Sequence, residues 1–289
     1  MAAPGAGVTL RSVVTPRPLN LIPIDRANDP RVADYLNIRD AQLAGELSPA
    51  GPRYMAEGEL VVETMLRAAR PAESLFLLPT RLETMGEVLA RHLPAGTPVY
   101  LASQGVMDAI VGIHLHRGVL ALGRRWPLPP LPDILRDATS ALVLEDLTNH
   151  DNMGGLFRAA AALGGPRPAI ILSPRSCDPL YRKSLRVSIG HALQVPYTIA
   201  SDWPEAIDAI NDAGFTTIAM TPSGSIDLTE LAKSPERPPR PAIVLGTEGR
   251  GLSDDAMSRC TLRARIAMND GVDSLNVVVA GAIALHALM

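Results

Sequence analysis

The sequence predicts an α/β fold in which a mostly parallel sheet carries helices on both faces. Runs typical of strands alternate with runs typical of helices along most of the chain, which is the pattern of such folds. In addition, three strands in the second half are each followed directly by a polar loop that contains glycine. A chain of 289 residues is long enough for one large domain or two ordinary ones, each with its own core.

Composition narrows the class of protein. Hydrophobic residues make up 47 % and charged residues 20 %, as in globular domains, and a formal net charge of -3 excludes an overall basic surface while allowing a local basic patch. Cys177 and Cys260 lie far apart, so we expect no disulfide framework and a reducing cytoplasm. We expect no secretory signal, since the N-terminus lacks an apolar core, and no membrane span, since the longest apolar run covers only residues 277–289.

The first half of the chain predicts a tail followed by a small domain. Residues 1–25 contain proline and glycine without periodicity and predict a tail. Residues 26–123 predict a small α/β domain with helices over 58–69, 82–93 and 103–112 and strands over 74–79 and 97–102. The proline-rich residues 124–136 predict a stiff, extended linker, because each proline fixes φ and blocks a helix. A proline-rich ligand for a partner domain is the alternative.

The second half, residues 137–289, predicts the main domain. We expect strands over 140–146, 168–173, 215–221, 241–248 and 261–268. We expect helices over 152–163, 178–193, 202–214 and 274–288, with Gly214 as a C-terminal cap. The carboxyl ends of parallel strands share one edge of the sheet, and ligands bind at that edge.

The three polar loops span residues 144–155, 245–255 and 266–276, and together they form the main functional signal. The second loop has the spacing G-x-x-G-x-G, which differs from the dinucleotide fingerprint, and no P-loop lysine follows it. Glu248 within this loop would repel a phosphate. The loop therefore predicts close approach of the backbone to a ligand other than a polyphosphate; a plain glycine turn is the alternative.

Two helices beside these loops contain unusual residues. The helix NMGGLFRAAAAL, residues 152–163, begins with two glycines that each cost up to about 1 kcal/mol against alanine, and it places Arg158 among apolar neighbours. A buried arginine would need a partner. Ser274 and Asn276 begin the last helix, and N-capping is the alternative to a functional role for them. One cap suffices, and we expect Asn276 to lie too far inside the helix to be another.

In order and position these loops resemble the motifs of the SpoU/TrmH family of RNA ribose 2′-O-methyltransferases, within the SPOUT class. The first motif, N-x-G-x-x-x-R, is present at Asn152, Gly154 and Arg158. The second is LGTEGRGLS at 245–253, and the third is IAMNDGVDSLNVVVA at 266–280. The resemblance covers residues from about 137 to 289, including the family's middle region at 177–197, and residues 31–125 more weakly resemble the L30e-like substrate-binding domain of some members.

The chain departs from the family pattern at two places. Asn149 and His150 stand where the family often has Asp-Pro, and Ala267 replaces a proline that is common in the third motif. Both changes preserve the backbone and the groups that face a ligand, so we expect them to be tolerated.

The resemblance implies a C-terminal domain with a deep trefoil knot, a homodimer, and S-adenosylmethionine held in the knot, without a metal ion. It implies a cofactor site that acts largely through backbone groups, formed by Gly246, Gly249, Ile266, Met268 and Leu275. Apolar walls and a few backbone hydrogen bonds suit an adenine ring. The resemblance also implies a polar catalytic cluster for methyl transfer to a ribose 2′-hydroxyl, formed by Asn152, Arg158, Glu248, Ser274 and Asn276.

Two roles are open for Arg158. The resemblance casts this residue as the proton acceptor, but a free guanidinium keeps its proton up to about pH 12. We therefore expect Arg158 to bind the adjacent phosphate and to stabilise the developing alkoxide, and we leave the proton acceptor open.

Basic side chains are candidates for holding the RNA backbone. The candidates are Arg175, Arg182, Lys183 and Arg186 in the second half, and Arg117 and Arg124 near the end of the first. A solvated helix face is the alternative. Aromatic residues are only 3 % of the chain, so we expect recognition of RNA shape, phosphates and 2′-hydroxyls rather than broad stacking. Metal binding by His114 and His116 is disfavoured, because no third ligand is near.

The leading hypothesis is therefore a cytoplasmic RNA 2′-O-methyltransferase that uses S-adenosylmethionine. Ribosomal RNA is the preferred substrate, transfer RNA is the second, and self-protection against an antibiotic that targets ribosomal RNA is a further biological role. The alternative is a catalytically inactive RNA-binding relative in ribosome assembly or regulation, against which the complete polar cluster argues. A nucleotide-dependent oxidoreductase is disfavoured, because the dinucleotide fingerprint is missing.

Overall fold

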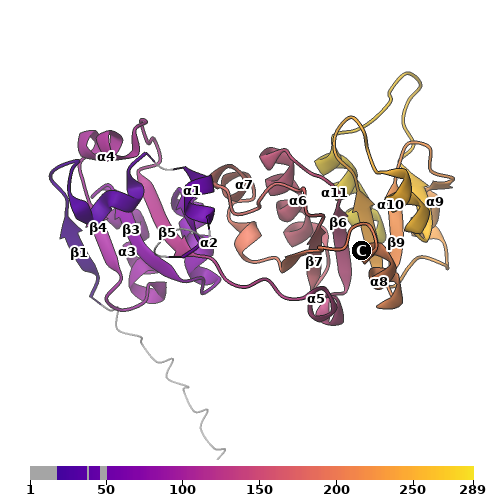
Figure 1. Cartoon of the computed structure of the whole chain (residues 1–289), viewed down its shortest axis with the longest axis horizontal. Coiled ribbons are helices and arrows are strands. Elements are labelled where there is room, and N and C mark those ends of the chain that lie inside the picture. The colour runs from indigo at the N-terminus through magenta and orange to yellow at the C-terminus, as the bar shows by residue number, and fades with distance from the viewer. Residues whose placement is uncertain (1–17, 38, 46–50) are drawn as a thin grey trace, which may run out of the picture.

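The computed structural model describes residues 18–37, 39–45 and 51–289, so most of the predicted tail lies outside the described residues. Two β-sheets stand side by side, one from the first part of the chain and one from the second (Figure 1). Helices pack on both faces of each sheet, in three apolar layers. The predicted α/β class is confirmed.

The first sheet has the strand order β1-β4-β3-β5-β2. Its strands are β1 (Asn20–Pro23), β2 (Arg53–Glu57), β3 (Ala72–Leu77), β4 (Pro98–Leu101) and β5 (Val119–Arg124). Helices α2 (Glu59–Arg67) and α3 (Arg81–His92) cover one face of this sheet. The other face carries η1 (Pro30–Tyr35) and α4 (Gln104–Val111). The short helix α1 (Asp40–Ala44) lies beside β2. The alternating burial of β3 side chains toward the two faces fits period-two packing.

The elements expected between residues 58 and 112 are all present, within two residues at each end. Strands β1, β2 and β5 were not expected. The prediction of a tail over residues 1–25 is wrong for residues 20–23, because β1 pairs in parallel with β4. Four residues are too few to show a periodic pattern, so only the pairing partner specifies this strand.

The second sheet is parallel throughout, in the order β10-β12-β9-β11-β6-β7-β8. Its strands are β6 (Ser140–Leu144), β7 (Pro168–Leu172), β8 (Tyr197–Ile199), β9 (Thr216–Met220), β10 (Ile226–Asp227), β11 (Pro241–Leu245) and β12 (Leu262–Arg265). One face carries α6 (His150–Leu163), α7 (Arg182–Val187), η2 (His191–Leu193), α9 (Leu228–Lys233) and α11 (Val277–Leu288); the other carries α5 (Leu131–Asp137), α8 (Ala206–Asp212) and α10 (Asp254–Arg259). The predicted parallel sheet covered on both faces is confirmed.

Two predictions for the second half need correction. The helix expected over 178–193 is broken into α7 and η2, because Ile189 and Gly190 adopt left-handed conformations with φ of 52° and 79°. The segment 124–136 is not extended throughout, since α5 begins at Leu131, after Pro130, and includes Pro132 in its first turn, where a helix tolerates proline. Gly214 follows α8 in the left-handed conformation expected beyond a helix end.

The two halves pack against each other through α7 and η2. The guanidinium of Arg70 donates to the carbonyl of Leu193 at 2.8 Å and lies over the Trp126 ring. The hydroxyl of Thr64 donates to the carbonyl of Ile189 at 3.0 Å. One apolar layer continues from α2 and α3 to α6, so the interface is part of the hydrophobic core.

Glycines in α6 and α11 allow three helices to approach closely. A Cβ on Gly154 would lie 2.5 Å from the carbonyl oxygen of Ser184 in α7. A Cβ on Gly155 would lie 2.8 Å from the side chain of Val278 in α11, and Gly281 of α11 faces Leu156 in the same way. The glycines that open the first-motif helix are therefore required by helix packing.

Gly154→Ala tests this packing against Gly86→Ala, a glycine inside α3 with open space around its Cβ position. We expect Gly154→Ala to lower the free energy of unfolding by about 1–3 kcal/mol, because backbone must move. Gly86→Ala should raise it by about 0.5–1 kcal/mol, because alanine favours the helix. Urea denaturation followed by circular dichroism measures both, and equal effects would contradict the packing argument.

Candidate active site

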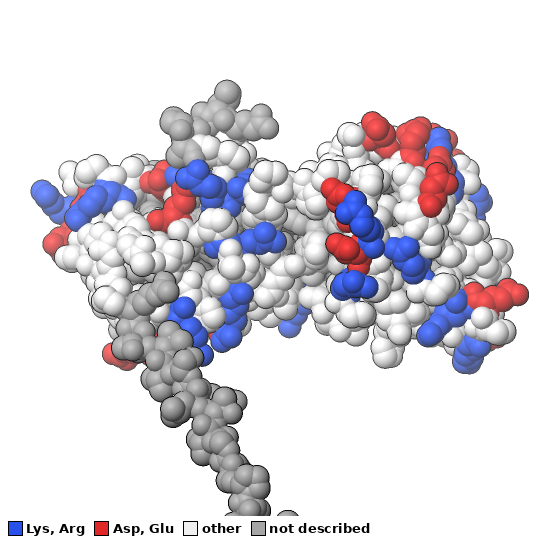
Figure 2. Space-filling model, turned by 90° about the horizontal axis from the view of Figure 1, so that it is seen from below, with Lys and Arg blue, Asp and Glu red and all other residues white. Residues whose placement is uncertain are grey.

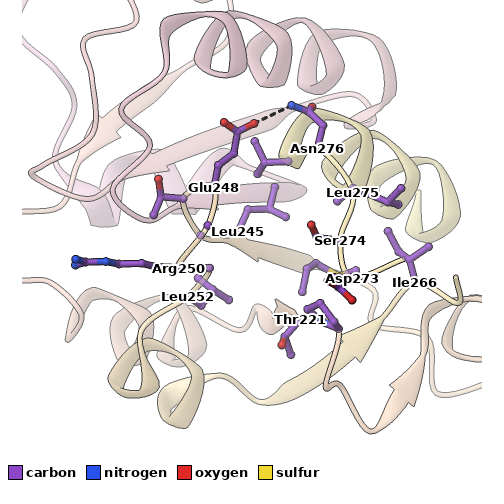
Figure 3. Close-up of a pocket in the computed structure, with 18 of the residues that line it drawn as sticks. Thr221, Leu245, Glu248, Arg250, Leu252, Ile266, Asp273, Ser274, Leu275 and Asn276 are labelled. Atoms are coloured by element: carbon purple, nitrogen blue, oxygen red, sulfur yellow. Dashed lines mark hydrogen bonds between the residues drawn. The ribbon is translucent and has the colours of Figure 1, made fainter. Parts of the chain in front are cut away.

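The loops that follow β9, β11 and β12 meet at the carboxyl edge of the second sheet and enclose a pocket of about 630 Å³ (Figure 3). Leu245 lines it from the end of β11, and Leu252 from the loop that follows. Thr221 lines it from the loop after β9, and Ile266 lies just after the end of β12. The volume lies in the range typical of small-ligand sites. The expected convergence of the second and third polar loops is confirmed.

The loop that follows β11, residues 246–252, is a tight turn that contains three glycines. A Cβ on Gly246 would lie 2.2 Å from the carbonyl carbon of Gly251, so only glycine fits where the two ends of the loop touch. The N–H of Gly251 donates to the carbonyl of Thr247 at 3.0 Å, and Gly249 and Gly251 have φ of 88° and 68°. Its glycines let two stretches of backbone pass this closely, and the loop from Gly246 to Leu252 forms one wall of the pocket.

Asn276 joins three parts of the site. Its side-chain N–H groups donate to Asn152 Oδ1 at 3.1 Å and to Glu248 Oε1 at 3.0 Å, and the second bond is drawn in Figure 3. Its Oδ1 accepts from the backbone N–H of Val278 at 2.9 Å, so Asn276 is the N-cap of α11. The expectation that Asn276 lies too far inside the helix is wrong, because α11 begins at Val277 and Ser274 lies outside it.

Asn152 does not line the pocket itself; it is bonded to Asn276, which does, and only 5 % of its surface is exposed. Its Nδ2 has no hydrogen-bond partner in the described part of the chain. An unpaired buried donor costs about 1–3 kcal/mol, which makes this atom a candidate for contact with a ligand.

Eight of the predicted site residues line the pocket: Gly246, Glu248, Gly249, Ile266, Met268, Ser274, Leu275 and Asn276. Arg158 does not line it. Its side chain is exposed on α6, and it makes no hydrogen bond or ion pair with any described residue. Arg158 therefore needs no buried partner, because α6 turns this position toward solvent, and its role in binding a phosphate stays a prediction.

The predicted site residues do not include the side of the pocket that is formed by the loop after β9. Met220, Thr221 and Pro222 line it there, and Leu252, Met257 and Asp273 complete the wall. A signal was available, since the strand expected over 215–221 is followed by the polar, glycine-containing stretch TPSGS. This is the same pattern that identified the other loops.

Most of the candidate RNA-binding cations have acidic partners. Arg182 lies 3.3 Å from Asp40 and Arg186 lies 3.3 Å from Glu57, so both bridge the two halves of the molecule. Ion pairs also join Lys183 to Asp151, Arg175 to Asp146 and Arg124 to Glu73. The side chain of Arg117 packs over Gly58. On the face seen in Figure 2, Lys and Arg side chains are interspersed with Asp and Glu. The distribution of charge on this face therefore does not identify an RNA-binding surface.

The described residues offer little support for a reactive thiol or a metal site. Burial raises the pKa of the Cys177 thiol to about 11, and that of Cys260 to about 11. The described residues contain no cluster of three side chains suited to a metal ion, and His114 instead contacts Asp108 at 2.6 Å. Within the same residues, every helix is too short or too polar to cross a bilayer.

Comparison with known proteins assigns the family. The sequence model of the SpoU rRNA methylase family matches residues 139–286, which contain every loop of the pocket. The chain belongs to the SpoU rRNA methylase family. An uncharacterized tRNA/rRNA methyltransferase of Mycobacterium bovis is 38 % identical over 259 residues, which cover 90 % of this chain and 88 % of that protein.

Solved structures share the fold of this SpoU family member. The AdoMet-bound rRNA methyltransferase from Sinorhizobium meliloti is 22 % identical with a TM-score of 0.73, over 93 % of this chain and 97 % of that chain. An RNA 2′-O ribose methyltransferase is 24 % identical with a TM-score of 0.66, over 92 % and 98 %. The resemblance inferred from the three motifs is confirmed, and the trefoil knot stays a prediction.

The two roles of Asn276 can be separated by substitution. Asn276→Ala removes the helix cap and both donor bonds, and we expect it to lower the free energy of unfolding by about 1–2 kcal/mol. Asn276→Ser keeps a capping oxygen for the Val278 N–H but lacks the amide donors to Asn152 and Glu248, so it should lower the free energy of unfolding by about half as much as Asn276→Ala. Urea denaturation measures both variants; full stability of Asn276→Ala would contradict the capping role.

Proposed function

We propose that this protein is an S-adenosylmethionine-dependent RNA methyltransferase that modifies a ribose 2′-hydroxyl. The observation that carries the proposal is the hydrogen-bonded chain from Asn152 through Asn276 to Glu248, beside the pocket formed by the loops after β9, β11 and β12. Family membership supports RNA methylation, and the similar fold of an RNA 2′-O ribose methyltransferase supports the ribose as the target.

The residues of the pocket fit the cofactor. Backbone N–H and carbonyl groups of the loop from Gly246 to Leu252 are the candidates to bond an adenine edge, because this loop lines the pocket. Leu245, Leu252 and Ile266 supply apolar surface for the ring faces. The AdoMet-bound structure from Sinorhizobium meliloti has the same fold, which supports this cofactor.

When bound, S-adenosylmethionine supplies a methyl group on a positively charged sulfur that leaves as a neutral thioether. The chain must therefore align the ribose oxygen and remove its proton. We propose that the unpaired Nδ2 of Asn152 and the hydroxyl of Ser274 position the ribose, and that Glu248 is the candidate to accept the proton. Arg158 stabilises the negative charge that develops on the oxygen, because its guanidinium stays protonated.

We propose that the site is completed in a homodimer. The exposed side of α11 is largely apolar: Val279, Ile283 and, just after the helix, Met289 are each at least 38 % exposed, and the exposed His286 is the polar residue among them. Arg158 lies one turn after Gly155, which packs against α11. A second copy seated on this apolar side would be symmetric, and it would receive Arg158 from the first copy.

We propose that residues 26–123 form a domain that binds the RNA, with ribosomal RNA as the preferred substrate and transfer RNA as the second. Loops of both sheets point to the same side of the molecule, where α4 and the long loops around the pocket lie (upper side in Figure 1). Arg117, Arg175 and Lys183 are exposed, and we propose that they bind phosphates of the RNA.

The central test is cofactor binding together with methyl transfer. We expect the purified protein to bind S-adenosylmethionine in a calorimetric titration and to transfer labelled methyl to RNA from cells that lack this gene. Mass spectrometry of the digested RNA should identify a 2′-O-methylnucleoside. Asn276→Asp should reduce transfer by about 100-fold or more, because a positioned donor is lost.

The possible negative results of this experiment contradict different parts of the proposal. Cofactor binding without transfer to any RNA would support the catalytically inactive relative. A methylated base in place of a methylated ribose would overturn the 2′-O assignment. No cofactor binding would overturn the enzyme proposal itself.

The homodimer makes a prediction about mixed dimers. In a heterodimer of Arg158→Ala with Asn276→Ala chains, purified through two different tags, one site would combine an intact Asn276 with Arg158 from the other chain. We expect about half of wild-type activity, while each homodimeric variant is inactive. An inactive heterodimer would place both residues in one chain's site, and a monomer in light scattering would contradict the dimer.

A further inference from the structure

Glu145 is a buried carboxylate that the proposed reaction does not use. It follows β6, and only 4 % of its surface is exposed. No salt bridge with Lys or Arg is present at this residue among the described residues. A buried charge without a counter-ion is costly unless several hydrogen bonds satisfy it, so its partners indicate its role.

Both ends of the β11 loop are attached to this one residue. The backbone N–H of Glu145 donates to the carbonyl of Leu245, the residue before the loop, at 2.9 Å. The carboxylate accepts from the N–H of Ser253, the residue after the loop, at 2.8 Å, and from the Ser253 hydroxyl at 2.7 Å. The loop between these attachments contains Glu248 and lines the pocket.

Glu145 itself is held in place from other directions. The indole N–H of Trp203 donates to Glu145 Oε1 at 2.8 Å. The next residue, Asp146, has a φ of 51°, and its backbone N–H donates to the hydroxyl of Ser173 at 2.8 Å. The carboxylate is therefore a fixed point against which the loop is set.

We infer that Glu145 is a positioning residue for S-adenosylmethionine binding, which acts by fixing both ends of the loop from Gly246 to Leu252. This inference rests on the proposed function of the pocket. Because Gly246 and Gly251 touch backbone to backbone, a small shift at Ser253 is transmitted to the pocket wall. The cofactor would then meet a loop that must first be ordered, which weakens binding.

Glu145→Gln tests the inference, because the amide has nearly the same shape but offers N–H groups to partners that are themselves donors. We expect its dissociation constant for S-adenosylmethionine to rise about tenfold or more in a calorimetric titration. The matched control is Trp203→Phe, which removes a bond to the same carboxylate but not to the loop, and it should change the dissociation constant by less than about threefold.

The titration separates positioning from loss of folded protein. The titration is run at a temperature at which circular dichroism shows each variant fully folded. Irreversibly denatured chains then lower only the number of binding sites per chain, whereas a displaced loop changes the dissociation constant. A wild-type dissociation constant for Glu145→Gln would overturn the inference. If Glu145→Gln gives no folded protein, Ser253→Ala decides: it removes one of the two loop bonds and should raise the dissociation constant about threefold, and an unchanged value would overturn the inference. A wild-type protein that does not bind S-adenosylmethionine would instead overturn the proposed function.

Discussion

The close packing of α6 between α7 and α11 is the contact on which the site depends. Gly154 and Gly155 bring the helix so near to its neighbours that a single methyl group would collide on either side. This approach brings the N-terminus of α6 beside that of α11, where Asn152 and Asn276 bond at 3.1 Å. A larger spacing would separate the two amides by more than a hydrogen bond can span. The first and third sequence motifs therefore act together only because the helices touch.

The same packing links the site to the first half of the molecule. Helix α7 contacts α6 on one side and presents Arg182 and Arg186 to Asp40 and Glu57 on the other. These arginines are only partly exposed, so their charges help to hold the two halves in one arrangement rather than standing free for a ligand. A ligand that binds along the first sheet would therefore meet the pocket in a defined orientation.

The sequence predicted what depends on local patterns. Periodicity identified the strands and helices around residues 58–112 and the five strands β6, β7, β9, β11 and β12, and the polar loops identified most of the pocket. Prediction from the sequence failed where a residue far away in the chain determines the local structure or the contacts of a side chain. Strand β1 exists because β4 pairs with it, and the acidic partners of Arg182 and Arg186 lie more than a hundred residues away. The role of Asn276 as a cap required the true start of α11, which the apolar run alone leaves uncertain by a few residues.

The cap on α11 also makes the first turn of that helix a reporter on the pocket. Fraying of the turn would release the amide of Val278 from Asn276 and, in the same motion, would detach Asn276 from Asn152 and Glu248. Local opening of a helix end and disassembly of the polar chain are thus one event with one equilibrium constant. The rate at which the Val278 amide exchanges its hydrogen with solvent consequently measures how often the polar chain is intact.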